Sequence, residues 1–205
     1  MGTRRYLLNG DVLYEGYDAG EWGGDLLVLD LRTGEWKKID YQGQCPYHLP
    51  VRDMQVGPGG VIWVVEGLAH LGESEGSLWV DQGGDWKRFA STERFSERTA
   101  TPWELPPSSM DGIAFGEDGA LWMLAEDLGV VRYDGTAWKQ LTRGWPGGQY
   151  VSCFCLTPNW VAVGMLDAGV LLWDLRSNTV RRVPLRIPGE PAPPGRGGLN
   201  RVRLW

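Results

Sequence analysis

Short apolar runs separated by turn residues recur along the whole chain. The clearest unit spans 110–142 and contains four such runs, with turn residues at 116–119 and at Asp134-Gly135. Apolar runs of this length bounded by Gly, Asn or Asp are typical of strands, and Asp-Gly between two of them indicates a hairpin. No long stretch has the apolar spacing of a helix. The pattern therefore predicts a four-stranded antiparallel sheet.

This unit has copies elsewhere in the chain. The last strand aligns without gaps at 34–39 (GEWKKI), 84–89 (GDWKRF) and 136–141 (TAWKQL), with a weaker copy at 178–183 (NTVRRV). The third strand also recurs, and each copy ends in an aspartate before a turn. These aspartates are Asp30, Asp81, Asp134 and Asp174. Because the anchor tryptophans lie about 50 residues apart, the period is that of a kelch-like blade.

The repeats predict a fold. The units span about 3–41, 49–95, 108–143 and 149–185. A sheet of four short strands cannot bury its faces alone, and repeated sheets solve this by stacking around an axis. We therefore predict one all-β domain, a small β-propeller of about four four-stranded antiparallel blades. Four is the low end of the usual blade number, so a compact ring and an incomplete propeller both stay open.

The segment 199–205 reads as one more strand, because apolar and arginine residues alternate in it. It follows a Pro/Gly tract, as the opening strands of the other units do. It could pair with the first unit and close the ring, or pair with another chain by strand addition. We favour closure, because the segment 175–205 carries seven Arg and one Glu while the whole chain has a net charge of −6.

One unit resembles a known blade family. Residues 117–122 (EDGALW) followed by 129–133 (GVVRY) resemble the two-component regulator propeller repeat of bacteria. The second unit matches partly, through 58–63 and 76–79. Where that family has Gly-Thr after its Trp strand, this chain has Leu124-Ala125. The resemblance implies a β-propeller and ligand sensing, and it implies no catalytic residues.

Composition narrows the class of protein. An isoelectric point of about 5.0 argues against general nucleic-acid binding, with the Arg-rich C-terminal segment as the exception. Three Cys exclude a complete disulfide framework, which fits a reduced, cytoplasmic compartment. No stretch has the ~20 apolar residues of a membrane span. The apolar run near the start of the sequence is too short before polar residues follow to be a signal peptide. We therefore expect a cytoplasmic protein without a membrane anchor.

Metal and catalytic motifs are weak. Cys45 and His48 lack a second ligand pair, so we expect no metal and no cofactor. Cys153 and Cys155 alternate on one strand face and are expected to be small buried residues. The recurring aspartates are expected to cap turns. The carboxylates that would serve a metal-dependent hydrolase or lyase at a channel mouth are Asp25, Asp53, Asp111, Glu126 and Asp127.

The tryptophans fall into two groups. Those that recur in register are expected to pack between blades, namely Trp36, Trp63, Trp86, Trp122 and Trp138. The irregular Trp22, Trp103, Trp145 and Trp160 are candidates for contact with a partner, because loop Trp is a common binding hot spot. The long polar linker 91–107 is expected to be mobile or to contact a partner.

These observations predict a non-catalytic scaffold that binds a partner protein through its loops. The predicted partner-binding residues are Trp22, Trp103, Trp145, Arg196, Arg201 and Arg203. The alternatives are a small-molecule sensor, as the resemblance implies, and a propeller hydrolase or lyase with a metal at the channel mouth.

Overall fold

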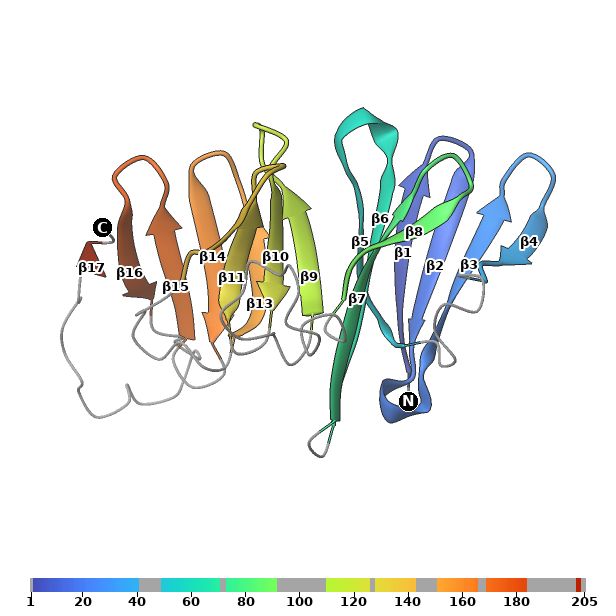
Figure 1. Cartoon of the computed structure of the whole chain (residues 1–205), viewed down its shortest axis with the longest axis horizontal. Coiled ribbons are helices and arrows are strands. Elements are labelled where there is room, and N and C mark those ends of the chain that lie inside the picture. Colours follow the sequence, from blue (N-terminus) through green and yellow to red (C-terminus); the bar gives the residue numbers. More distant parts are fainter. Residues whose placement is uncertain are drawn as a thin grey trace, which may run out of the picture.

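A computed structural model describes most of the chain. The described residues are 2–40, 49–70, 73–91, 110–125, 128–142, 151–165, 169–183 and 202–203. They form four consecutive antiparallel sheets in which each strand lies beside its neighbour in sequence. The predicted all-β fold of four four-stranded propeller blades is therefore confirmed (Figure 1).

The blades have the following strands. Blade 1 contains β1 (Thr3–Asn9), β2 (Val12–Asp18), β3 (Gly24–Asp30) and β4 (Glu35–Lys38), with the short helix η1 (Gly20–Trp22) between β2 and β3. Blade 2 contains β5 (Val51–Val56), β6 (Ile62–His70), β7 (Glu73–Asp81) and β8 (Trp86–Ser91), with η2 (Pro58–Gly60). Blade 3 contains β9 (Met110–Phe115), β10 (Leu121–Ala125), β11 (Gly129–Tyr133) and β12 (Trp138–Gln140). Blade 4 contains β13 (Val151–Leu156), β14 (Trp160–Met165), β15 (Gly169–Asp174) and β16 (Thr179–Val183).

The core lies between consecutive blades. The described residues form three apolar clusters, one at each junction. Their buried members include Leu26 and Trp79, Leu78 and Met123, and Val130 and Leu171. The first strands of consecutive blades also contact one another, β1 with β5, β5 with β9 and β9 with β13. Each fully buried aliphatic side chain contributes about 1.5–3 kcal/mol to folding, so the stacking of blades supplies the stability that a single blade lacks.

The recurring aspartates cap the turns between the third and fourth strands, as predicted. Oδ1 of Asp134 accepts hydrogen bonds from the amides of Thr136 and Ala137, both at 2.9 Å. Oδ1 of Asp30 accepts from the amide of Arg32 at 2.8 Å, and Asp81 and Asp174 cap their turns in the same way. These bonds hold the pKa of Asp134 down at about 2 and also lower that of Asp30. The repetition is therefore structural.

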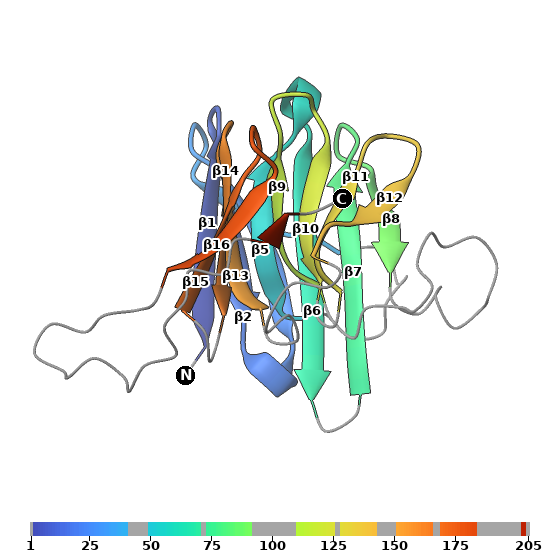
Figure 2. The ribbon, with the colours of Figure 1, turned by 90° about the vertical axis from the view of Figure 1, so that its left-hand side faces the viewer.

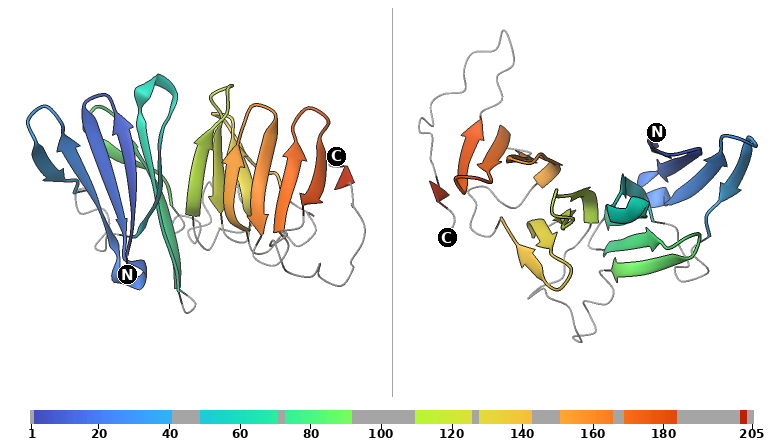
Figure 3. Two further views of the ribbon diagram at one scale, coloured as in Figure 1. Left: turned by 180° about the vertical axis from the view of Figure 1, so that it is seen from behind. Right: turned by 90° about the horizontal axis from the view of Figure 1, so that it is seen from above.

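The four blades form an open arc. Blade 1 and blade 4 lie at opposite ends of it, and blades 2 and 3 meet in the middle (Figures 1 and 3). In a strand, successive side chains point to opposite faces, so each end blade has one face toward its neighbour and one face away from it. On blade 1 the face that points away, here named the blade 1 end face, carries Tyr6, Leu8, Leu13, Leu27, Leu29 and Trp36. On blade 4 the corresponding blade 4 end face carries Cys153, Cys155, Ala162, Leu172, Arg181 and Val183. Figure 2 views the molecule from the end of the arc at which blade 4 lies.

The expected burial of Trp36 and of the two strand cysteines is wrong, because these residues lie on end faces. Trp63, Trp86, Trp122 and Trp138 belong to or pack against the junction clusters, but Trp36 is 51% exposed. Cys153 and Cys155 alternate on one strand face as expected, yet both are exposed. All three residues lie on an end face, where the arc places no further blade among the described residues.

The C-terminal strand does not lie where we expected it. Of the segment 199–205, the structure describes β17 (Val202–Arg203), which pairs with Thr179 and Val180 of β16. The strand therefore extends blade 4 at its last strand, and the predicted pairing with the first unit is wrong for these residues. An edge strand offers unpaired backbone groups, and the local edge of β16 is the nearest one to satisfy them.

Candidate partner-binding site

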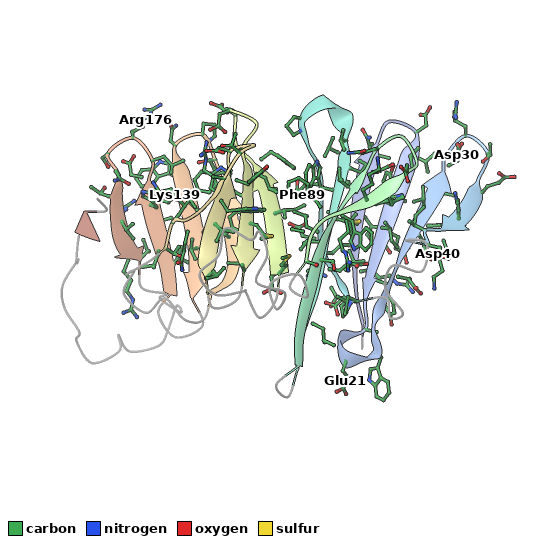
Figure 4. The ribbon with its side chains drawn as sticks, viewed as in Figure 1. Glu21, Asp30, Asp40, Phe89, Lys139 and Arg176 are labelled. Atoms are coloured by element: carbon green, nitrogen blue, oxygen red, sulfur yellow. The ribbon has the colours of Figure 1, made fainter. Side chains whose placement is uncertain are left out.

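Trp22 is the most exposed large apolar side chain among the described residues, with 85% of its surface accessible. It lies on η1, at the end of blade 1 opposite its two hairpin tips (Figure 1). The neighbouring Glu21 points away from the sheets (Figure 4). Exposing an indole costs hydrophobic free energy, so such a side chain on an ordered turn is a candidate for contact with a partner.

The turn that carries Trp22 is closed by its own backbone. The amide of Ala19 donates to the carbonyl of Gly23 at 2.9 Å, and the amide of Gly23 donates back to Gly20 at 3.0 Å. Gly20 and Gly23 have φ of 64° and 88°, values that an L side chain rarely adopts. The turn therefore presents Trp22 in one backbone conformation, which reduces the entropy lost on binding.

Asp18 joins this turn to the second blade. Its Oδ1 accepts a hydrogen bond from the amide of Gly20 at 2.8 Å, and its Oδ2 accepts one from Nη1 of Arg52 at 2.9 Å. Arg5 adds a third contact, with its Nη1 at 3.7 Å from Oδ2 of Asp18. The Asp18 side chain is only 10% exposed, so this ion pair is shielded from water more than a surface pair is.

Arg52 extends the connection to the third blade. Its Nε donates to the carbonyl of Gly67 at 2.8 Å and lies 3.7 Å from Oδ1 of Asp111. Arg5 donates in turn to the carbonyl of Val51 at 3.1 Å. The guanidinium groups thus bridge β1, β2, β5, β6 and β9. The Trp22 turn is held by a charged network that spans three blades.

Backbone packing supports the same turn. A Cβ on Gly24, the first residue of β3, would lie 2.7 Å from Cα of Pro50 and 2.8 Å from the carbonyl oxygen of Leu49. Only glycine allows this close approach. Because Leu49 and Pro50 lead directly into β5, the end of the Trp22 turn is packed against the start of blade 2.

Two of the carboxylates considered for chemistry have structural partners, and one of them links two blades. Asp53 accepts hydrogen bonds from the amides of Met54 at 2.8 Å and Ile113 at 3.0 Å, so it links β5 to β9. Burial raises the pKa of Asp53, and these amide bonds lower it in part. Asp25 lies in an ion pair with Lys38 on the blade 1 end face. Both groups have structural partners.

Most of the other predicted contact residues lie outside the described part of the chain. These are Trp103, Trp145, Arg196 and Arg201, together with most of the linker 91–107, Cys45, His48, Glu126 and Asp127. Arg203 is described only as a backbone position in β17. Trp160 is half-buried, and the guanidinium of Arg181 lies 5.5 Å above its ring. Of the two irregular tryptophans in the described part of the chain, Trp22 is therefore the one with an exposed side chain.

Sequence reasoning missed the supporting network. The spacing of Asp18 and Gly20 is typical of a carboxylate that caps the following turn, so the sequence held a local signal for this contact. The contact between Asp18 and Arg52 joins residues 34 positions apart and has none.

No group of three or more His, Cys, Asp or Glu side chains in the described ranges is arranged to hold a metal ion. No helix in this part of the structure has the length and apolar character needed to cross a membrane.

Comparison with known proteins identifies structural likeness only. No family model matches the chain and no curated protein matches its sequence. The solved structure of YCF48 bound to D1 peptide is similar over 84% of this chain and 50% of that one, with 16% identity and a TM-score of 0.48. A putative 6-phosphogluconolactonase from Bacteroides fragilis is similar over 87% and 49%, with 12% identity and a TM-score of 0.44. The extracellular domain of a putative one-component system from B. thetaiotaomicron is similar over 88% and 33%, with 12% identity and a TM-score of 0.42.

The chain thus spans half or less of the length of these three structures. The β-propeller that the regulator-repeat resemblance implies is present, and the resemblance itself stays at the level of the blade pattern.

Proposed function

We propose that this protein is a non-catalytic propeller scaffold that binds a partner protein through the Trp22 turn. The observation that carries the proposal is the 85% exposed indole of Trp22 on a turn held by the partly buried Asp18–Arg52 ion pair. Rigid, exposed tryptophans supply much of the binding free energy in protein interfaces. The ligand-sensing role implied by the resemblance would use the same rigid scaffold with a different ligand.

The described carboxylates support a scaffold over the hydrolase alternative. Asp18 and Asp53 bridge blades, and Asp30, Asp81, Asp134 and Asp174 cap turns. A catalytic carboxylate is expected to depart from the repeat and to face a substrate. Each of these side chains instead has a structural role.

The test uses three baits in the native host: the wild-type chain, Trp22→Ala and Leu31→Ala. Leu31 is 49% exposed in the turn after β3, so it controls for the loss of an exposed apolar side chain. A protein that co-purifies with wild type and Leu31→Ala, but is lost from Trp22→Ala, is then purified and its Kd is measured. We expect Trp22→Ala to raise that Kd about 30-fold, the equivalent of a 2 kcal/mol hot spot. Equal recovery of every protein on all three baits would refute the proposal.

A further inference from the structure

The blade 1 end face repeats a surface that is packed against a neighbouring blade elsewhere in the same chain. On blade 3, cross-strand neighbours form an apolar row that packs against blade 2, made of Phe115, Leu121, Tyr133 and Trp138. The equivalent row on blade 1 is Leu8, Leu13, Leu29 and Trp36. The blade 3 row faces the preceding blade, the blade 1 row lies on the corresponding side of its own sheet, and both rows end in the repeat tryptophan. The blade 1 end face therefore has the composition of a blade junction.

The apolar side chains of the blade 1 end face are unusually exposed to solvent. Leu8 is 60% exposed, Tyr6 58% and Trp36 51%. Its charged groups are largely paired with each other, since Nε of Arg4 lies 3.3 Å from Glu15 and Nζ of Lys38 pairs with Asp25. The Leu and Trp row is thus left as an apolar surface that a covering sheet can bury without stripping water from unpaired charges.

The blade 4 end face is the complementary surface. It lies on the side that faces a following blade, as the covered faces of blades 1, 2 and 3 do. Part of this face has small side chains: Ala162 stands where the second strands of blades 2 and 3 carry Trp63 and Trp122, and Cys155 and Cys153 are exposed beside it. Larger side chains border this part, namely Trp160, Leu172 and Arg181. The large side chains of the blade 1 end face can therefore pack over the part of this face that carries Ala162 and the two cysteines, as interdigitating layers require.

We propose that a second copy of this chain covers both end faces, with blade 1 of each copy stacked on blade 4 of the other. The open arc places the two end faces at opposite ends of one chain, so a single copy in this conformation does not join them (Figure 3). A two-fold axis makes both junctions identical and leaves no end face uncovered. Two sets of four blades give a ring of eight, within the usual range of propellers. The interface continues the three junctions already present in the chain.

The first measurement is the mass of the full chain by sedimentation equilibrium. We expect a dimer, at twice the 22.8 kDa of the monomer. Leu8→Arg on the blade 1 end face and Cys155→Arg on the blade 4 end face should each yield a monomer. Both positions are exposed, so the substitutions are compatible with the fold, and circular dichroism checks this. Leu31→Arg, at an exposed turn, is the matched control and should remain a dimer.

The second measurement is the reaction rate of the Cys155 thiol, in a chain that carries Cys45→Ser and Cys153→Ser. At a total chain concentration of about ten times the dimer Kd, about one fifth of the chains are monomeric, so the thiol should react about fivefold more slowly than it does when Leu8→Arg is also present. This links the two faces, because a change on blade 1 would then expose a residue on blade 4.

Four outcomes would overturn the proposal. One is a monomer at every concentration with a reactive Cys155. Another is a monomer whose Cys155 is protected until Leu8→Arg is introduced, which means closure within one chain. The third is a dimer that Cys155→Arg leaves intact, which means that two blade 1 faces pair. The last is an open-ended polymer. None of these bears on the Trp22 turn, whose test is the recovery of a different protein.

Discussion

Blades 1 and 3 carry the same kind of apolar row on the same side of the sheet, and they differ in what covers it. On blade 3, Leu121 is 3% exposed, and the Trp138 ring lies tilted against Tyr133 with the ring centroids 4.9 Å apart. Phe89 of blade 2 lies 5.4 Å from the Tyr133 ring and closes the junction (Figure 4). On blade 1, Leu8 and Trp36 each keep more than half of their surface accessible. The repeat position therefore determines the type of residue, while the neighbouring blade determines its burial.

The largest expected difference comes from the same Leu→Ala substitution at equivalent repeat positions of blades 4 and 1. Leu171 on β15 is 1% exposed at the junction of blades 3 and 4, and Leu27 on β3 is half-buried on the blade 1 end face. Both pair with the second strand at the same register. Leu171→Ala should lower the free energy of unfolding by about 3 kcal/mol and Leu27→Ala by about 1 kcal/mol or less, because only the first leaves a cavity.

The pair is measured by urea denaturation in chains that also carry Cys155→Arg, so that association does not contribute. Equal losses at the two positions would mean that the blade 1 end face is covered within the monomer, and the comparison would fail.

The repeat tryptophans give a second pair, with a smaller expected effect. Trp138→Ala should cost about 2–3 kcal/mol, below the range for a fully buried Trp because Trp138 is only half-buried. Trp36→Ala should cost less than about 1 kcal/mol in the same monomeric chain, since the indole is 51% exposed there. Denaturant midpoints at constant m-value provide the measurement. A loss at Trp36 as large as that at Trp138 would contradict the assigned burial.

Substitution of the turn-capping aspartates of blades 3 and 1 should have the smallest effect on stability. Hydrogen bonding lowers the pKa of Asp134 from its ordinary 3.8 to about 2, and it lowers that of Asp30 in the same direction. A carboxyl group with a depressed folded pKa contributes stability that is present above pH ~3.8 and is lost as the pH falls through the folded pKa. Asp134→Asn and Asp30→Asn should each make the melting temperature fall less between about pH 4 and pH 2 than it does in wild type.

Thermal melts across this pH range, compared with those of the wild-type chain, test the caps. The Asn side chain keeps an oxygen that can cap the turn, so stability near neutral pH should change little. An acid profile identical to that of wild type in both variants would show that other carboxyl groups dominate the acid loss.

Much of the fold could be predicted because its signals are local. Alternating apolar residues, Asp-Gly turns and the Asp caps each act over a few positions, and the four strand sets follow from them. Trp22 could be proposed as a surface residue because it breaks the repeat. The network that supports the Trp22 turn could not be predicted, because the contacts of Arg52 with Asp18, Gly67 and Asp111 join three blades.

The sequence by itself determined the strands, the turns, the blade period and the residue type at each repeat position. Only the tertiary structure decided that Trp36, Cys153 and Cys155 are exposed, because burial depends on whether another blade lies against a face. It also decided that Val202 pairs with Val180 of its own blade. An apolar residue that awaits a covering sheet and one that already has it look identical in sequence, since the covering atoms come from distant residues or from another molecule.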